Sequence, residues 1–245
     1  MDILLNGALG RMSREVIGLA EKTEGTSVAA KVDINGDGAD CLTDINDFEG
    51  KADVIIDFSF HAGTPALMDY AVKTHTPVVL ATTGHTEEEL EAVKNAAKEI
   101  PVFHSANMSL GVALLAELAV KTASLMPDAD IEIVETHHNR KLDAPSGTAL
   151  MLANAIKTVR EQAALKLGRA GGGKREKNEI GIHAVRRGNI VGIHEITVST
   201  DCETLTLKHE AHTRALFAEG ALTAAEFIAG KPAGLYDMYS IVRGK

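Results

Sequence analysis

Short apolar runs alternate with helical patterns in the N-terminal part of the chain. The runs are rich in Ile, Val and Leu, as buried strands are, and they cover residues 2–6, 26–32, 53–58, 77–81 and 100–104. The clearest helix between them covers 86–99, because Thr86 followed by Glu89 forms a capping box and Pro101 stands just past the end. This alternation predicts an α/β fold with a doubly wound parallel sheet, whose ligand lies off the carboxyl ends of the strands.

The pattern changes beyond residue 108. The elements expected there are a helix over 110–126, a strand over 130–136, a helix over 148–165, antiparallel-type strands over 180–187, 190–199 and 203–210, and an apolar helix over 215–229. The glycine-rich segment 168–179 is expected to be mobile. Strands in series after a parallel half predict a second, α+β domain. Since the last helix is apolar enough to pack on the first domain, we place the domains at 1–107 plus 215–245 and at 108–214.

A glycine turn lies where the first strand meets the first helix. Residues Gly7 to Ser13 have the spacing G-x-x-G-x-x-S, and in this context backbone amides and the helix dipole favour a pyrophosphate. Asp33 ends the second strand, where a carboxylate can accept hydrogen bonds from ribose hydroxyls and repels a 2′-phosphate. Together they favour a dinucleotide site, although the turn alone also fits an ordinary tight turn, and Asp33 also fits a plain turn residue.

The densest chemistry lies between the strand at 130–136 and the helix that follows. His137 and Lys141 stand four residues apart on a connecting loop, and rigid scaffolds often carry chemistry on such loops. An imidazole and an ammonium placed together can exchange protons near neutral pH. Ser146 and Thr148 stand at the helix start with Gly147 between them, an N-terminus that attracts a carboxylate or phosphate.

Two other interpretations of this loop remain open. The first is a basic surface turn with two solvated histidines. The second is a metal site formed by Glu135, His137, His138 and Asp143, which is disfavoured because adjacent side chains on an extended chain point to opposite faces. Further along, Arg214 ends the second domain and could act as an anion clamp. Histidines also lie on or near the later strands, where partly buried strand residues are favoured over the alternative of direct substrate contacts; they are His183, His194, His209 and His212.

Composition narrows the range of functions. The formal net charge is −9 without a long basic run, which argues against a nucleic-acid partner. Only Cys41 and Cys202 are present, so a disulfide framework is not expected and a reducing cytoplasm is the natural compartment. No apolar run approaches the length of a membrane span, and the start has no secretory pattern. The chain is therefore expected to be a cytoplasmic protein without membrane or nucleic-acid partners, and any anionic ligand must be held by local charge.

The chain resembles the 4-hydroxy-tetrahydrodipicolinate reductase family, formerly called dihydrodipicolinate reductase, over essentially its whole length. The segment from Glu135 to Ala149 agrees with the family pattern E-x-H-H-x-x-K-x-D-A-P-S-G-T-A at each specified position. Further agreement lies in the glycine turn, in Thr82-Thr83-Gly84, and in the segment from Arg186 to His194. The resemblance implies a Rossmann-type doubly wound parallel sheet with a second α+β substrate and oligomerisation domain built on an open mixed sheet.

The resemblance also implies an activity and its residues. The reaction would be the NADH- or NADPH-dependent reduction of 4-hydroxy-tetrahydrodipicolinate, a cyclic dicarboxylate, in diaminopimelate and lysine biosynthesis by a cytoplasmic homotetramer. His137 would donate or accept a proton, and Lys141 would donate one. Substrate contacts are implied for His138, Lys141, Ser146, Gly147, Thr148 and Arg214. Cofactor contacts are implied for Gly7, Ala8, Leu9, Gly10, Arg11, Met12, Asp33, Ala81, Thr82, Thr83, Ala106, Asn107 and Met108; no metal is implied.

Three positions depart from the family pattern. Ser13 and Ala81 stand where the family has glycine, and Met108 where it often has phenylalanine, which bears on cofactor affinity and not on reaction type. Asp33 without a following arginine favours NADH over NADPH, although Arg11 and Lys31 could still meet a 2′-phosphate.

Two function classes compete with this one. A dehydrogenase for aspartate or an aspartate-derived aldehyde would share the glycine turn but not require Lys141. A non-catalytic dinucleotide sensor would keep its function when Lys141 is lost.

Overall fold

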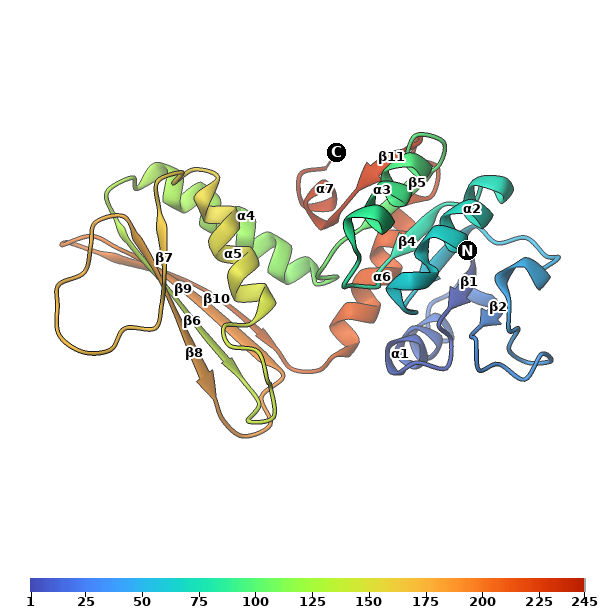
Figure 1. Ribbon diagram of the computed structural model, residues 1–245, viewed down its shortest axis with the longest axis horizontal. Coiled ribbons are helices and arrows are strands. Elements are labelled where there is room, and N and C mark those ends of the chain that lie inside the picture. Colours follow the sequence, from blue (N-terminus) through green and yellow to red (C-terminus); the bar gives the residue numbers. More distant parts are fainter. Residues whose placement is uncertain (245) are drawn as a thin grey trace. The chain divides into compact units, whose positions relative to one another are not determined.

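The computed structural model describes residues 1–244, which form two compact units (Figure 1). Unit 1 contains Met1–Leu110 and the chain from Ala215 onward, and unit 2 contains Gly111–Arg214. Each unit is built on its own β-sheet. The chain therefore leaves unit 1 once, completes unit 2, and returns to unit 1 at its last long helix.

The sheet of unit 1 has six parallel strands in the order β11-β5-β4-β3-β1-β2. Their bounds are β1 Asp2–Asn6, β2 Ser27–Val32, β3 Val54–Asp57, β4 Val78–Leu80, β5 Pro101–His104 and β11 Gly234–Tyr236. The strands are almost continuously apolar because helices cover both faces. Five of them match the predicted strands, and β11 was not predicted. The chain order reverses between β1 and β3, so the ligand crevice of such a sheet is expected at their carboxyl ends.

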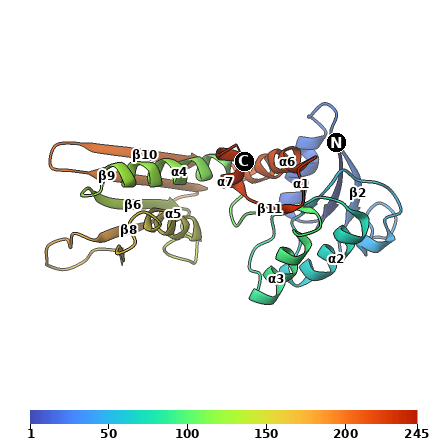
Figure 2. The ribbon, with the colours of Figure 1, turned by 90° about the horizontal axis from the view of Figure 1, so that it is seen from above.

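Helices cover the two faces of this sheet in pairs. The helices are α1 Arg11–Ala20, α2 Thr64–Thr74, α3 Glu87–Ala96, α6 Ala215–Ile228 and α7 Met238–Val242, with short 3-10 turns η1 Ile45–Asp47 and η2 His61–Gly63. α1 packs beside α6 and α2 beside α3, and Figure 2 shows the two pairs on opposite sides. At the start of α3, Thr86 accepts a hydrogen bond from the Glu89 amide while Glu89 accepts one from the Thr86 amide, which confirms the predicted capping box.

The sheet of unit 2 is mixed, with five strands in the order β10-β9-β6-β8-β7. Their bounds are β6 Asp130–His137, β7 Ala164–Leu167, β8 Glu179–Arg186, β9 Gly192–Ser199 and β10 Thr204–Ala211. β8 runs parallel to β6 and β7, while β9 is antiparallel to β6 and β10. The expected antiparallel series was therefore wrong for β8, because β6 inserts between β8 and β9. Because β6 is the central strand of the sheet, its residues Ile131 and Ile133 are buried, with exposures of 2% and 0%.

The helices of unit 2 are α4 Leu110–Leu125, which begins at the boundary, and α5 Gly147–Lys157. α5 packs on β6. It ends well before residue 165, where the sequence pattern placed its end. Beyond it, the Arg160 guanidinium donates to carbonyl oxygens of Ala123, Met126, Pro127 and Ala129 at the end of α4. Residues 164–167 then pair with β8 as a strand, so tertiary contacts override the helical propensity of this Ala- and Leu-rich stretch.

The glycine-rich segment before β8 is attached to the sheet. Arg175 donates hydrogen bonds to the carboxylates of Asp130 and Glu132 and to the carbonyl oxygens of Ile131 and Glu179. Arg169 of the same segment pairs with Glu179 at 2.6 Å and with Glu132 at 3.6 Å, so two guanidinium groups join the segment to the sheet. Along β9, buried residues alternate with half-exposed ones, so one face of the sheet is covered and the other is open.

We predict that Gly220→Ala destabilises the protein. Gly220 lies in α6, and a Cβ there would come within 1.7 Å of the Met108 carbonyl oxygen. The methyl group would push α6 from the loop after β5, at a cost of about 1–3 kcal/mol. Gly18→Ala in α1 is the control, since nothing lies within 4 Å of its Cβ position and alanine favours a helix. Urea unfolding measures both; equal stabilities for the two variants would contradict the packing argument.

Candidate active site

The crevice at the carboxyl ends of β1 and β3 contains a cavity of about 570 Å³. Gly7 and Gly10 of the first loop line it together with Asp33 after β2 and Phe58 to Phe60 after β3. The cavity thus lies at the point where the strand order reverses, as expected for a doubly wound sheet. Its wall joins the glycine turn and Asp33, which are far apart in the sequence.

The glycine turn is closely packed against the loop after β3. Gly7 has a φ of +75°, and a Cβ there would come within 2.7 Å of the Phe58 carbonyl oxygen and of Ser59 Cα. Only glycine fits such a position. Ser13 is fully buried, and its hydroxyl donates a hydrogen bond of 2.7 Å to the Gly7 carbonyl oxygen. The departure from the family pattern at Ser13 therefore adds a bond that fixes the turn.

Asp33 is bonded directly to the glycine turn. One carboxylate oxygen accepts a hydrogen bond of 3.1 Å from the Leu9 amide, and the other accepts one of 3.0 Å from the Asn35 amide. The carboxylate lines the cavity and retains lone pairs for further donors. Arg11 is exposed at the first position of α1, with Ala8 buried and Leu9 exposed ahead of it.

The buried side chain of Asp57 joins the ends of three strands at this edge of the sheet. Asp57 ends β3 without solvent exposure and accepts hydrogen bonds from Asn6, Ser59 and Thr82 at 2.7, 2.6 and 2.6 Å. Burial raises the pKa of Asp57, and the bonds oppose that shift. We did not single out this residue from the sequence, although an acidic residue ending the apolar run from Val54 was a usable signal.

The remaining expected cofactor residues follow β4 and β5 at the same edge of the sheet. Ala81 and Thr82 are buried, and Thr83 is exposed. After β5, Ala106 is exposed, whereas Met108 is buried against α6. The side chain of Asn107 accepts a hydrogen bond from the Ser109 amide at 2.9 Å. All of the expected cofactor residues therefore lie in unit 1, on loops at the carboxyl ends of the strands or on the first turn of α1.

Unit 2 contains a second buried carboxylate, that of Glu135 on β6. Arg186 on β8 donates to both of its oxygens at 2.8 and 2.7 Å, the Ser146 amide donates at 3.0 Å, and His137 Nδ1 lies 2.5 Å away. Burial raises the pKa of Glu135, but the hydrogen bonds from Arg186 and His137 outweigh it and the net shift is downward. Glu135 is therefore an ionised group that ties β6, β8 and the start of α5 together.

This carboxylate fixes one ring nitrogen of His137. With Nδ1 against Glu135, the other ring nitrogen, Nε2, lies on the far side of the ring, 3.1 Å from the Cβ position of Gly192 at the start of β9. The His194 ring packs against His137 with centroids 5.2 Å apart, and its Nε2 lies 3.2 Å from the Ser146 hydroxyl. Burial, followed by the neighbouring His137, lowers the pKa of His194 to about 4, so His194 is a neutral partner at neutral pH.

The loop after β6 brings Lys141 and His138 to the same end of the sheet. The Lys141 ammonium lies 2.8 Å from a carboxylate oxygen of Asp143. The His138 amide donates to the Ile190 carbonyl oxygen at 2.8 Å. Burial, then Arg140 and Arg214, lower the pKa of His138, so Arg214 acts electrostatically on this region although its own side chain is exposed.

The N-terminus of α5 completes the arrangement. Ser146 is the N-cap, and its hydroxyl accepts a hydrogen bond of 3.2 Å from the Ala149 amide. Gly147 is exposed with nothing within 4 Å of its Cβ position, and Thr148 follows half-buried. An open helix start beside an ammonium suits a carboxylate. The sequence pointed to Arg186 and His194 only through the family resemblance, and it did not predict that they reach this site from β8 and β9.

Within residues 1–244, no group of three or more His, Cys, Asp or Glu side chains is arranged to hold a metal ion. The described helices include none that is both long and apolar enough to cross a bilayer.

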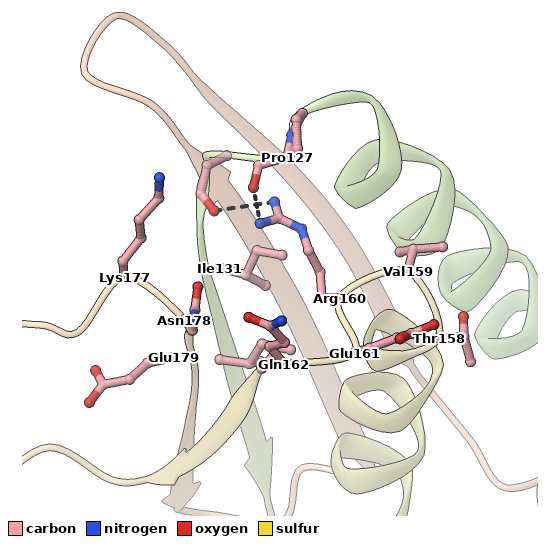
Figure 3. A pocket seen from close by; sticks show the side chains of 13 residues that line it. Pro127, Ile131, Thr158, Val159, Arg160, Glu161, Gln162, Lys177, Asn178 and Glu179 are labelled. Carbon is pink, nitrogen blue, oxygen red and sulfur yellow. Dashed lines mark hydrogen bonds between the residues drawn. The ribbon is translucent and has the colours of Figure 1, made fainter.

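A second cavity, of about 410 Å³, lies at the opposite end of β6 from His137 (Figure 3). Its two cations are already engaged. Arg160 points its guanidinium at backbone carbonyl oxygens, including that of Pro127, and Lys177 pairs with Asp128 at 2.9 Å. Arg160 and Lys177 therefore bind groups of the protein itself at this end of the sheet.

Known proteins match both units. Residues 1–108 match the family described as dihydrodipicolinate reductase, N-terminus, and residues 111–242 match its C-terminus. The 4-hydroxy-tetrahydrodipicolinate reductase of Caldanaerobacter subterraneus subsp. tengcongensis is 46% identical, covering 98% of each chain. That of Clostridium novyi is 43% identical, covering 99% of this chain and 98% of the other. The solved structure of dipicolinate-bound dihydrodipicolinate reductase from Paenisporosarcina sp. TG-14 aligns over 97% of both chains with a TM-score of 0.78 and 23% identity. The chain therefore belongs to the dihydrodipicolinate reductase family of oxidoreductases.

Proposed function

We propose that this chain reduces 4-hydroxy-tetrahydrodipicolinate to tetrahydrodipicolinate in diaminopimelate and lysine biosynthesis, with NADH or NADPH as the reductant. One observation carries the proposal: an imidazole fixed by a buried carboxylate and an ammonium lie beside an open helix N-terminus. Relatives named for this activity match along nearly the whole chain. An aspartate dehydrogenase would not need this loop, and a non-catalytic sensor would not need Lys141.

The nucleotide would be held at the carboxyl edge of the sheet in unit 1. The cavity there and the Gly7 position, which a Cβ would fill, fit a pyrophosphate lying against backbone. The contacts would come from Gly7, Ala8, Leu9, Gly10, Arg11, Met12, Asp33, Ala81, Thr82, Thr83, Ala106, Asn107 and Met108. When bound, the reduced nicotinamide supplies a hydride. Asp33 favours NADH, since its carboxylate can bind ribose hydroxyls and repels a 2′-phosphate.

The substrate would be held in unit 2 through its two carboxylates. The Gly147 amide and the Thr148 hydroxyl at the start of α5 suit one of them, because a helix N-terminus favours an anion. Cationic or hydrogen-bonding partners would come from His138, Lys141, Ser146 and Arg214. A protein with a net charge of −9 needs such a local group of donors to attract a dianion.

Proton transfer is the part of the reaction that the side chains perform. The substrate loses its hydroxyl as water and gains a hydride and a proton, so charge that builds next to the reduced carbon must be neutralised. The Lys141 ammonium would donate that proton. His137, fixed by Glu135, would present Nε2 to the reacting groups as a proton donor or acceptor.

The two units would divide these tasks, with the dinucleotide in 1–107 plus 215–245 and the substrate in 108–214. The open face of the mixed sheet, with Ile193 and Glu195 half-exposed on β9, supports assembly of unit 2 into a homotetramer. A biosynthetic role in the cytoplasm agrees with the two cysteines, which are free in the structure.

The assay that tests the function couples enzymatic generation of the substrate to this protein and follows NADH and NADPH absorbance in parallel. Failure to oxidise either nucleotide would refute it.

We predict that Lys141→Ala lowers kcat about 100-fold or more, because the general acid is lost. The matched control is Lys177→Ala, since Lys177 also forms an ion pair with an aspartate, at 2.9 Å, but lies away from the loop. The coupled assay measures both variants. Activity of Lys141→Ala within a few-fold of the wild type would exclude the proton-donor role.

We predict that Glu135→Gln lowers kcat about tenfold or more, because an amide no longer fixes His137 as a carboxylate does. The melting temperature also falls, since Arg186 loses its buried counter-charge. Glu132→Gln on the same strand is the control, because Glu132 also pairs with arginines but lies at the other end of β6. If both variants lost stability alike and neither lost kcat, Glu135 would have a structural role only.

We predict that Asp33→Asn shifts cofactor preference toward NADPH by about tenfold in the ratio of kcat/KM values, because a repulsive charge is removed. Asp44→Asn serves as the control, since Asp44 lines the same cavity but caps the turn η1. Parallel assays with the two nucleotides give the ratio. An unchanged ratio in Asp33→Asn would show that the preference has another origin.

A further inference from the structure

Asp143 lies within the group of donors assigned above to the substrate carboxylates. Its carboxylate is 2.8 Å from the Lys141 ammonium, with side-chain exposures of 56% for Asp143 and 22% for Lys141. The hydrogen bond from Lys141 lowers the pKa of Asp143, and the Gly147 backbone amide acts in the same direction. An internal carboxylate is therefore paired with Lys141, one of the groups that a substrate carboxylate would use, and it lies near the start of α5.

Two hydrogen bonds hold the main chain on either side of Asp143 and Ala144. Arg186 donates a hydrogen bond of 2.7 Å to the Asp143 carbonyl oxygen while it also binds Glu135. The Ser146 amide donates to the same glutamate. Because the backbone is held on both sides of Ala144, an exchange of partners at Lys141 requires only that the exposed Asp143 side chain change rotamer.

The charges at this end of the sheet determine how the replacement of Asp143 by a ligand carboxylate at Lys141 affects binding. The neighbouring cations are Arg140, Lys141 and Arg214, and Glu135 is neutralised by Arg186. Asp143 is thus the carboxylate whose charge a dianionic ligand would meet at Lys141. Exposed ion pairs contribute little net free energy, so a ligand carboxylate can displace Asp143, although it has to compete with it.

We propose that Asp143 is an internal competitor for the substrate carboxylate and so sets the affinity of the enzyme for dicarboxylates. The proposal rests on the function proposed above, because it assumes that Lys141 and Gly147 receive the substrate. It assigns Asp143 an effect on binding and not on the transfer of the proton. Removal of its charge is therefore expected to tighten binding of a ring dicarboxylate.

The test is calorimetric titration of the full-length protein with dipicolinate in the presence of NADH. For Asp143→Asn, the dissociation constant is expected to fall about threefold to tenfold, the range for one screened charge near a dianion. Asp130→Asn is the matched control, because Asp130 pairs with Arg175 at 2.8 Å and has a similar exposure of 54%. It is expected to leave the dissociation constant unchanged. Asp143→Ser, which keeps the Arg186 bond to the backbone, replaces Asp143→Asn if that variant does not fold.

The outcomes separate this proposal from the function itself. Wild type that fails to bind dipicolinate would refute the proposed substrate site and the competitor with it. Wild type that binds, with Asp143→Asn equal or weaker, would refute the competitor alone. The tighter binding of dipicolinate by Asp143→Asn is expected to disappear when Lys141→Met is added, because Asp143 acts on the ligand through its competition for Lys141. If the double variant still binds dipicolinate more tightly than Lys141→Met alone, the proposal is overturned. In steady-state assays the effect is expected in KM, and a fall in kcat at unchanged KM would contradict it.

Discussion

The arrangement of unit 2 depends on one buried carboxylate, Glu135. A carboxylate without solvent exposure is tolerated only when its oxygens are bonded and its charge is paired. Arg186, the Ser146 amide and His137 meet this requirement from β8, from the start of α5 and from the end of β6. The need to satisfy one charge therefore fixes the orientation of the imidazole, the position of the helix N-terminus and the neighbour of β6 in the sheet.

Unit 1 also has a buried acidic side chain at the ends of its strands, but this one is held by neutral hydrogen-bond donors. Asp57 is buried at the end of β3, and its bonds to Asn6, Ser59 and Thr82 join the ends of β1, β3 and β4. Those ends carry the loops around the cavity that Gly7 and Asp33 line. In both units a buried, hydrogen-bonded carboxyl group joins the loops at the ends of several strands, and such fixed positions are what preorganised binding and catalysis require.

The sequence predicts local features well and long-range pairings poorly. The capping box of Thr86 and Glu89 and the first five strands follow from short patterns, and the structure confirms them. The helix expected to reach residue 165 stops at Lys157, because residues 164–167 pair with β8 as a strand. Arg186 could not be assigned a role from the sequence, since it lies 51 residues from Glu135 and its partner is set by the order of the strands. The motif from Glu135 to Ala149 shows which residues matter, but it does not show that Glu135 fixes His137.

The proposed function requires that a hydride from a bound nicotinamide and a proton from the loop after β6 reach the same ring. The most direct measurement is mass spectrometry of the product formed from enzymatically generated substrate and NADH carrying deuterium at the transferred position. The expected product is tetrahydrodipicolinate that contains one deuterium, formed as the labelled nucleotide is oxidised. Nucleotide oxidation that leaves the product unlabelled, or the absence of any reduced product, would contradict it.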